Sequence, residues 1–519
     1  MIANLPCFQD FENKNDLPER IYYGSNGSKP LLKLLTVFIA MEKLEDFVYC
    51  IKEGMDDGCL PMKVDNASGG NRLLYCKHHE THHTTINELR RPSYRTQFMQ
   101  WSYSLIAPCI ASTKYKHSHY HLDAGDIFPM TSGNKLQKQG ATGKGSKAQT
   151  YEESLAYGGF SEVYRVEIDN SHYDFGNIGI IHHEKNAFAL KKLTSRDRND
   201  FDMELSSLLF CMDKSIKEKV DKHMTQPLAT FEVDESVANG KTYYILFEWA
   251  NGNLNDFWKK KDKRRLDKAH CKWMSHEFYS LCRALACVHN GQEEYLQTLD
   301  GEDLEKKLQV TSSDASRLYG RHGDIKPDNF LWLGPSESLG RLALSDFGLG
   351  RLHTQVSRSN QDPRNIARTE TYKAPEFELP GNKISRASDI FSLGCVFLEY
   401  VTWYLLGSQK LTEEFSSSRS EADINGFESD AFFVIRSIEG ENGPRPFLKE
   451  GVKNWIKKLQ NHEDCTWYLY QLLEIIRDKM LSPDREKRIK IIPLIKEMDK
   501  LRQACERNNS FYLTPKNKS

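Results

Sequence analysis

The segment at residues 322–331 constrains the fold of this chain more than any other feature. It reads His-Gly-Asp-Ile-Lys-Pro-Asp-Asn-Phe-Leu, so Asp324 and Asn329 stand just ahead of an apolar run. After a further short strand pattern comes Ser-Asp-Phe-Gly, which supplies a carboxylate at Asp346. Mg²⁺ takes few protein carboxylates and completes its shell with other oxygens, so one aspartate and one asparagine suit it. The sequence therefore predicts Asn329 and Asp346 as metal ligands.

An earlier turn in the chain is a candidate binding site for the phosphates of a nucleoside triphosphate. A turn between two strand patterns reads Ala156-Tyr-Gly158-Gly159-Phe160-Ser-Glu-Val163. Glycines in such a turn allow backbone N–H groups to approach phosphate oxygens, and Phe160 can close over them. Two glycines between strands are more often a plain hairpin, so this turn is a weak signal by itself.

Two charged residues after the turn are candidates for binding and orienting the phosphates. Lys191 lies on the predicted strand 187–193 and can reach the α- and β-phosphates. Glu204 lies on the predicted helix 201–212 and can pair with that lysine. Each residue taken singly is more often a surface charge.

Phosphoryl transfer is the chemistry that these residues share. Asp324 can orient an acceptor hydroxyl and take its proton, and Lys326 can neutralise charge on the group in transit. The triphosphate, the metal and the hydroxyl each have a candidate partner in a fixed order along the chain.

In this order the motifs resemble the signature set of the eukaryotic protein kinases, across roughly residues 125–503. The resemblance implies an α+β fold of two lobes, one small and β-rich and one large and helical, with ATP and Mg²⁺ between them. It implies that Phe247 is the gatekeeper and that Glu248 and Ala250 lie in the hinge that meets adenine. The implied nucleotide site comprises Ala156, Gly158, Gly159, Phe160, Val163, Ala189, Lys191, Phe247, Glu248 and Ala250.

The resemblance also implies supporting residues and a substrate class. Asp389 would brace the catalytic loop, and Glu376 of Ala-Pro-Glu would pair with Arg488. Lys326 together with Thr369 is similar to the serine/threonine pattern rather than the tyrosine pattern, which implies serine and threonine hydroxyls of a protein as acceptors. More narrowly, four segments resemble a large group of fungal kinase-domain proteins; these are residues 51–62, 319–332, 371–380 and 384–403.

The chain departs from the family pattern at three positions. Ala156 and Ser161 replace glycines of the phosphate turn, and Gly323 replaces the arginine of His-Arg-Asp. In the family that arginine commonly meets a phosphorylated residue of the activation loop. We hypothesise that activity here does not depend strictly on such phosphorylation. The same departures leave a pseudokinase open as the alternative: a scaffold that binds nucleotide or partners without turnover.

Composition shifts divide the chain into five predicted parts. They are a helical N-terminal module at 1–130, a flexible linker at 131–150, the small lobe at 151–250, the large lobe at 251–503 and a tail at 504–519. Residues 31–55 are predicted to form one buried helix. A polar stretch at 290–319 is expected to be solvated, and 407–465 is either a partner-docking segment or extra packing for the large lobe. The N-terminal module is also a candidate interaction module whose partner the kinase would regulate.

Composition bears on location and on partners. Lysine and arginine number 71 against 72 acidic residues, so bulk charge gives no support for a nucleic acid partner. The 12 cysteines show no C-x-x-C spacing, as expected for reduced thiols in a cell. The N-terminus shows no secretion signal or membrane span, so an intracellular, cytoplasmic protein is expected. The basic run 259–265 leaves nuclear import open, although a solvated helix face is the preferred interpretation.

Two histidine clusters were weighed as metal sites. His79 and Glu80 with His83 match H-E-x-x-H, which on a helix would place both histidines on one face with the glutamate as base. The surrounding run is polar and favours an exposed loop. His117, His119 and His121 form a second cluster, and the two clusters together could bind a metal.

Overall fold

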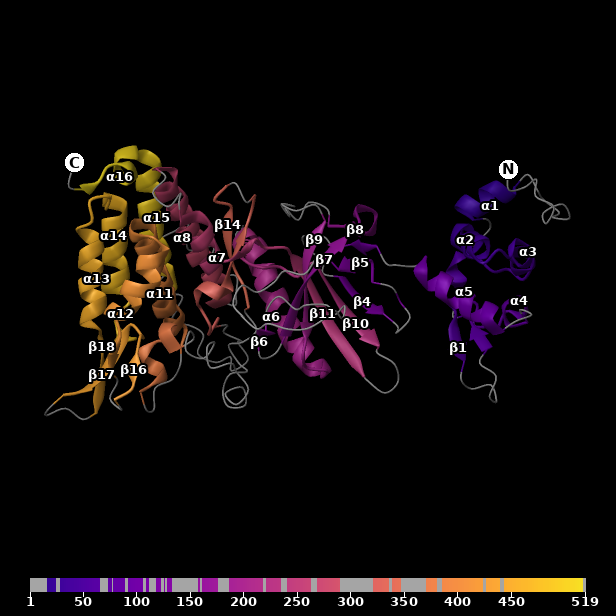
Figure 1. Cartoon of the computed structure of the whole chain (residues 1–519), viewed down its shortest axis with the longest axis horizontal. Helices are drawn as coiled ribbons and strands as arrows, with labels where there is room; N and C mark the ends of the chain where they lie inside the picture. Colours follow the sequence, from indigo (N-terminus) through magenta and orange to yellow (C-terminus); the bar gives the residue numbers. More distant parts are fainter. Residues whose placement is uncertain are drawn as a thin grey trace, which may run out of the picture.

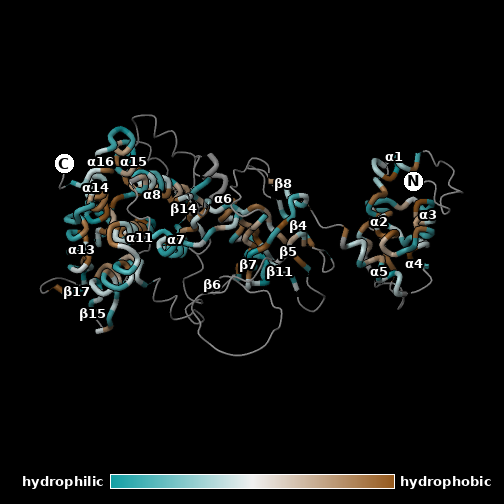
Figure 2. Tube along the Cα trace, turned by 45° about the horizontal axis from the view of Figure 1, so that its top comes forward, coloured by the Kyte–Doolittle hydropathy of each residue, from teal (hydrophilic) through white to brown (hydrophobic). Residues whose placement is uncertain are grey.

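The computed structural model describes three parts of the chain, which follow one another in sequence order along its long axis (Figure 1). Figure 2 shows hydrophobic residues gathered along the strands of the central sheet and among the helices of the C-terminal part. The residues described are 16–24, 29–65, 73–76, 78–88, 92–105, 109–111, 118–122, 126, 128–132, 157–158, 161–175, 186–217, 221–234, 240–262, 268–289, 321–335, 338–346, 370–379, 385–422, 426–438 and 443–516.

The N-terminal module is mainly helical and has a hydrophobic core of its own. At its centre the Phe38 ring packs against Phe47 and Phe98, at centroid distances of 6.0 and 5.6 Å. Its elements are α1 (Leu17–Tyr23), α2 (Leu32–Ala40), α3 (Leu44–Lys52), the 3-10 turn η3 (Asp57–Cys59), β1 (Lys63–Asp65), β2 (Leu73–Tyr75), α4 (Thr84–Asn87) and α5 (Pro92–Ser104).

The single helix predicted at 31–55 is wrong, because the chain forms two helices there. Between α2 and α3, Glu42 takes a φ of 57°, and the Lys43 N–H donates to the Phe38 carbonyl at 2.9 Å. This is the hydrogen bond of a helix C-terminus that closes through a left-handed residue. The reversal folds α3 back so that Phe47 is buried together with Phe38, which one straight helix could not do.

The central part is a β-sheet with one long helix, α6 (Arg198–Lys217). Its strands lie in the order β4-β10-β11-β9-β7-β5, and β6 also pairs with β7. They are β4 (Ser118–Leu122), β5 (Met130–Ser132), β6 (Tyr157–Gly158), β7 (Ser161–Ile168), β9 (Ala187–Leu193), β10 (Ala229–Asp234) and β11 (Lys241–Glu248), and the short β3 (Ile110–Ala111) pairs separately with β8 (Tyr173–Asp174).

The predicted boundary between the N-terminal module and the small lobe lies too far along the chain. β4 runs parallel to β10, and β5 pairs antiparallel with β7, so residues assigned to the module and to the linker form strands of the sheet. Ile110 and Leu122 are buried in the core of the small lobe. β4 reads Ser-His-Tyr-His-Leu, in which only Tyr120 and Leu122 alternate with polar residues, and this apolar pattern is too short to signal a strand. The rest of the predicted linker, 133–150, lies outside the described residues.

The C-terminal part is a large helical lobe around one hydrophobic core. Figure 1 shows its long helices packed alongside one another. They are α7 (Leu254–Lys261), α8 (Lys268–His289), α11 (Arg386–Leu406), α13 (Glu450–Gln460), α14 (Trp467–Ile475), α15 (Ile491–Arg507) and α16 (Asn509–Leu513). The expected α+β arrangement of a β-rich small lobe and a helical large lobe is therefore confirmed.

One helix in the described part of the chain, α11, is long and apolar enough to cross a membrane by length and composition alone. In the structure 94% of its apolar window is buried inside the large lobe. It is a core helix of this lobe.

Two other boundaries of the large lobe are now defined. Residues 504–516 were predicted as a tail, but Tyr512 is buried and the Lys516 N–H donates to the Cys465 carbonyl at 2.8 Å. Segment 407–465 buries Phe415, Phe432 and other apolar residues in the lobe core, which favours the packing interpretation. It contains a π-helical turn (Lys410–Phe415), a short α-helical turn, α12 (Ser416–Ser418), and two hairpins. The hairpins are β15–β16 (Glu421–Ala422, Glu428–Ser429) and β17–β18 (Phe433–Ser437, Pro444–Leu448). The polar stretch 290–319 lies outside the described residues.

Candidate active site

The register of the small-lobe sheet brings four predicted nucleotide-site residues to one face. Val163 on β7 pairs with Lys191 on β9, and Ala189 pairs with Phe247 on β11. Directly opposed residues of antiparallel strands point to the same side, and residues two apart on one strand do so too. Val163, Ala189, Lys191 and Phe247 therefore form a contiguous surface of alternating apolar and charged character.

Lys191 is held between two carboxylates that come from different elements. Its Nζ lies 2.7 Å from Glu204 Oε1 on α6 and 3.2 Å from Asp346 Oδ1. Burial alone would lower the pKa of Lys191, but the Asp346 and Glu204 carboxylates outweigh it and raise the pKa. In turn the Lys191 ammonium holds the pKa of Asp346 below its ordinary value. The contact between Lys191 and Asp346 therefore favours the charged form of both groups.

A two-stranded hairpin places the predicted metal ligands at one end of the large lobe. β13 (Phe330–Leu333) pairs antiparallel with β14 (Arg341–Leu344), so the residue before β13 lies beside the residue after β14. There the Ser345 N–H donates to the Asn329 carbonyl at 3.0 Å. Asn329 and Asp346 thus flank the same hairpin end, and Asp346 has a φ of 60°, a conformation that non-glycine residues rarely adopt outside functional sites.

The loop before β13 fixes the predicted catalytic aspartate. The Lys326 Nζ lies 2.7 Å from Asp324 Oδ2. The Asn329 Nδ2 donates both to the Asp324 carbonyl, at 2.7 Å, and to its Oδ2, at 3.1 Å. Because the amide oxygen of Asn329 is then turned the other way, it stays available to a cation. The loop orients one carboxylate, one ammonium and one amide around a common point.

A buried aspartate on α11 holds this loop from behind. Asp389 accepts hydrogen bonds from the backbone N–H groups of His322 and Gly323, both at 2.9 Å. Burial opposes its ionisation, but the hydrogen bond from His289 and that from Gly323 keep its pKa below the ordinary value. Gly323 has a φ of 81°, which glycine adopts without strain. Asp389 therefore braces the loop as expected.

Part of the predicted site lies outside the described residues. β6 and β7 pair with Gly158 opposite Ser161, so the phosphate turn is a hairpin. Ala156, Gly159 and Phe160 of that turn are not among the described residues, and neither are Phe347, Gly348 and Thr369.

Comparisons with known proteins agree with this geometry. Residues 320–497 match the family model described as "Protein kinase domain". Cyclin-dependent kinase E-1 of Arabidopsis thaliana is 27% identical over 180 residues, which cover 32% of this chain and 36% of that protein. The human serine/threonine-protein kinase/endoribonuclease IRE2 is 39% identical over 127 residues, covering 22% and 13%. The serine/threonine-protein kinase ppk23 of Schizosaccharomyces pombe is 28% identical over 131 residues, covering 25% and 29%.

The matched family region contains the loop of Asp324, the hairpin and Asp389 in the geometry described above. Residues 320–497 therefore match the protein kinase domain, and the comparisons support the eukaryotic protein kinase superfamily for this part of the chain. The chain spans between 13% and 36% of the length of these three relatives, so their whole-protein activities are not carried over to it.

The segment after β11 connects the two lobes of the kinase domain. Glu248, at the end of that strand, pairs with Arg341 of the large lobe at 2.6 Å. Just after the predicted hinge, the Asn251 N–H donates to the carbonyl of Trp332 in the large lobe at 2.8 Å. The side chain of Glu248 is thus committed to the contact between lobes, and its role in the predicted hinge is one of positioning.

A buried ion pair joins two segments of the large lobe. Glu376 and Arg488 form a bidentate ion pair, at 2.8 Å for Nη1–Oε1 and 3.0 Å for Nη2–Oε2. Both residues are 3% exposed. The pairing that the resemblance implied is therefore found, and it ties the segment before α11 to the turn before α15.

Two buried groups escaped the sequence analysis. His289 ends α8 and lies 2.8 Å from Asp389, 100 residues away in sequence. The Tyr372 hydroxyl donates to Glu399 at 2.7 Å, and Arg419 pairs with the same carboxylate at 3.1 Å. The charged Glu399 within the apolar run of α11 was a signal, since a buried charge requires a partner. Which partner it finds depends on the tertiary fold.

Proposed function

We propose that the chain is an active protein kinase that transfers the γ-phosphoryl group of ATP to serine or threonine hydroxyls of proteins. One observation carries the proposal: Lys191 contacts both Glu204 and Asp346, so the small lobe, α6 and the metal-ligand segment are assembled together. This lysine–glutamate pair and the aspartate must both be in place for kinase catalysis.

The residues present fit Mg-ATP. Asp346 is an ionised carboxylate that is 43% exposed, and Asn329 has an amide oxygen that its own hydrogen bonds leave available. These two would hold Mg²⁺, and Lys191 would meet the phosphates. The metal would neutralise charge on the β- and γ-phosphates. Val163, Ala189 and Phe247 offer the apolar face that a purine ring requires.

Asp324 and Lys326 act on the acceptor. Asp324 is fixed by Asn329 and Lys326, so its carboxylate can orient an incoming hydroxyl and accept its proton. Lys326 can then neutralise charge on the group in transit. The preference for serine and threonine is supported by Lys326 and by the relatives that are named serine/threonine kinases.

We also propose a cytoplasmic location. Ten cysteines have described side chains, and all ten are free thiols, as in a reducing compartment. Within the basic run 259–265, Lys259 and Lys260 are exposed, as the solvated-face interpretation expects, whereas Lys261 is buried. The Lys260 Nζ also donates to the Asn251 carbonyl at 2.8 Å, so two lysines of the run are engaged by the fold, which disfavours its use as an import signal.

The alternative is a pseudokinase, and it rests on Ala156 and Gly323. The structure gives Gly323 a purpose that does not involve loss of activity, because its N–H contributes to the Asp389 brace and its φ suits glycine. The intact set of Lys191, Glu204 and Asp346 favours turnover.

The test is incorporation of labelled phosphate from Mg-ATP into a generic acceptor protein and into the chain itself. Lys191→Met and Asp324→Asn are compared with Lys192→Met, since the Lys192 side chain leaves β9 on the opposite face. We expect Asp324→Asn to lose about 10²–10⁴-fold of the rate, the usual contribution of a general base. Lys192→Met should retain the rate. Hydrolysis of the labelled product then identifies the phosphorylated residue.

Three outcomes would contradict the proposal in whole or in part. Equal incorporation by wild type and both active-site variants would mean that another kinase contaminates the preparation. ATP binding by the wild type without incorporation would establish the pseudokinase. Label on tyrosine alone would retain the kinase and reject the serine/threonine preference.

A further inference from the structure

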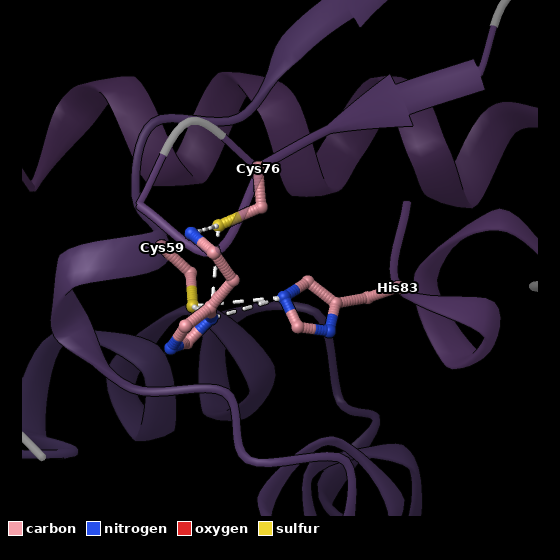
Figure 3. Close-up of side chains that lie close together, drawn as sticks. Cys59, Cys76 and His83 are labelled. Atoms are coloured by element: carbon pink, nitrogen blue, oxygen red, sulfur yellow. Dashed lines mark hydrogen bonds between the residues drawn. The ribbon is translucent and has the colours of Figure 1, made fainter. Parts of the chain in front are cut away.

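Four potential metal ligands converge in the N-terminal module, away from the kinase cleft. They are the Sγ atoms of Cys59 and Cys76 and one ring nitrogen each of His79 and His83, and all lie within 4.8 Å of one another. Figure 3 shows Cys59, Cys76 and His83 pointing toward a common point from three separate pieces of backbone. Cys59 ends η3, Cys76 follows β2, and His83 precedes α4.

The separations fit one tetrahedral ion. Cys59 Sγ lies 3.3 Å from His79 Nδ1 and 3.8 Å from His83 Nε2. His79 Nδ1 lies 3.9 Å from Cys76 Sγ and 3.4 Å from His83 Nε2. Around tetrahedral Zn²⁺, bonds of about 2.3 Å to sulfur and about 2.0–2.1 Å to nitrogen place ligand atoms about 3.3–3.8 Å apart. The four measured distances span nearly the same range.

Backbone groups support both sulfur atoms. The Asp56 N–H donates to Cys59 Sγ and the His79 N–H donates to Cys76 Sγ, each at 3.4 Å. Such bonds stabilise thiolate ligands. His83 turns its other ring nitrogen, Nδ1, to within 3.8 Å of Glu53 Oε2, as histidine ligands commonly do toward a carboxylate.

Charge and burial select the kind of ion. Cys59 and Cys76 are 1% and 0% exposed and His83 is 5% exposed, while His79 covers the solvent side. Two thiolates would balance one divalent cation, and two neutral imidazoles would complete its shell. We propose that Cys59, Cys76, His79 and His83 bind one structural Zn²⁺ ion. Four protein ligands leave no open position, so the site is closed and not catalytic.

The H-E-x-x-H motif contributes histidines to this site, but not as a protease helix. Residues 78–80 form a turn, Cys76 and Thr81 pair as an isolated bridge, and Glu80 has a φ of 52°. Helix α4 begins only at Thr84, so the helical alternative for His79–His83 is wrong. The backbone reversal after Cys76 is what turns His79 back toward the sulfur.

Neither of the other candidate groups among the described residues competes with this site. His119 and His121 approach Glu232, but Arg198 and Lys241 already pair with that carboxylate, and a metal would meet two positive charges. Those histidines lie on β4, so the two clusters do not join. In the set of Asp56, His78 and His79, the Asp56 carboxylate already accepts the N–H groups of Lys29 and Gly58, both at 2.8 Å.

The ion would fasten parts of the module that other contacts hold weakly. β1 and β2 are three residues each and α4 is four, which is too short for independent stability. Zn²⁺ would link the end of this hairpin and the start of α4 to η3, and through it to α2, whose first turn Asp57 caps with bonds to the N–H groups of Lys33 and Leu34.

The test is the metal content of the purified full chain, measured by plasma mass spectrometry without chelators. We expect about one zinc per chain in the wild type and its loss in Cys59→Ser and Cys76→Ser. Cys50→Ser removes a buried thiol of the same core that is not a ligand, and it should retain the metal. His79→Asn is compared with His78→Asn for the same reason, and only the former should weaken zinc retention.

Cobalt substitution of the unmodified chain keeps the test valid where a variant does not fold. Tetrahedral Co²⁺ with two thiolates gives intense visible bands and sulfur-to-metal charge transfer, which would support the proposal. An absorption spectrum without these bands, or zinc retained by the Cys59→Ser/Cys76→Ser double variant, would overturn it. So would a Cys59–Cys76 disulfide, detected as resistance of both thiols to alkylation before reduction.

Discussion

The kinase cleft and the Cys–His cluster of the N-terminal module both gather polar side chains, but they balance charge differently. In the kinase domain each principal charge has its partner within the chain: Lys191 with Glu204, Arg488 with Glu376. In the module, the four converging side chains are two thiols and two imidazoles, and none of them is a lysine or arginine that could balance two thiolates. The contrast teaches that a cluster of potential ligands without a positively charged side chain favours binding of a metal cation. A network of paired charges, such as that in the kinase domain, needs no such cation.

The largest expected effect comes from removing an internal partner. Arg488→Ala leaves Glu376 buried and uncompensated, so we expect the free energy of unfolding of the large lobe to fall by about 3–5 kcal/mol. Urea unfolding followed by tryptophan fluorescence measures it.

Arg485→Ala is the matched control for this change. Arg485 pairs with Glu486 at 2.9 Å on the surface, so its loss should cost no more than about 1 kcal/mol. Similar effects of the two variants would contradict the distinction between buried and exposed pairs in this lobe.

Glu277 on α8 is a third case beside the ion pairs and the Cys–His cluster. Its buried carboxyl group is neutralised by a bound proton and not by a cationic side chain or a metal ion. Burial raises its pKa to about 8, although a hydrogen bond from the Leu342 N–H at 2.7 Å opposes the shift. An ordinary glutamate titrates near 4.5. Between these values the folded protein keeps a proton that the unfolded chain has lost. The contribution of Glu277 is therefore greatest at low pH and declines as the pH rises toward 8.

Glu277→Gln should remove this decline. Across the window between the two pKa values, we expect the stability of the variant to fall less steeply than that of the wild type, by up to about 1.4 kcal/mol per pH unit. Urea titrations at several pH values measure it, and Glu463→Gln, at an exposed position, serves as control. Parallel pH profiles for wild type and Glu277→Gln would show that His223, 3.5 Å away, balances the carboxylate instead.

The smallest expected effect concerns phosphate on the activation loop, on which we hypothesise that activity does not strictly depend. Gly323 has no side chain to meet a phosphorylated loop residue, so phosphatase treatment should leave most of the activity. Intact mass before and after treatment checks that phosphate was removed. Loss of all activity, restored when the chain phosphorylates itself again, would contradict this hypothesis.

The catalytic constellation could be predicted from the sequence because its members occur in a fixed order within short motifs. Lys191, Glu204, Asp324, Asn329 and Asp346 were all singled out, and the structure brings Lys191 to Glu204 and Asp346 as a single group. The strand that carries Lys191 and the helix that carries Glu204 were also predicted, at 187–193 and 201–212, and the structure forms them as β9 and α6.

Other features had no local signal. The turn at Glu42, which divides the predicted helix 31–55, follows from the burial of Phe38 against Phe47 and not from a glycine or proline. β4 has only two alternating apolar residues, Tyr120 and Leu122, and its pairing with β10 shows it to be a strand. These boundaries were wrong because packing decided them.

The sequence by itself determined the protein kinase domain and the order of the motifs that carry the candidate catalytic residues, because each motif is a short run of neighbouring residues. The tertiary structure alone decided where the module ends, which partner each buried charge meets, and that Cys59 and Cys76 join His79 and His83. These residues are spread over 25 positions, from 59 to 83, and no repeated spacing links the cysteines. Long-range contacts depend on how several elements pack at once, and that information is not contained in any one segment.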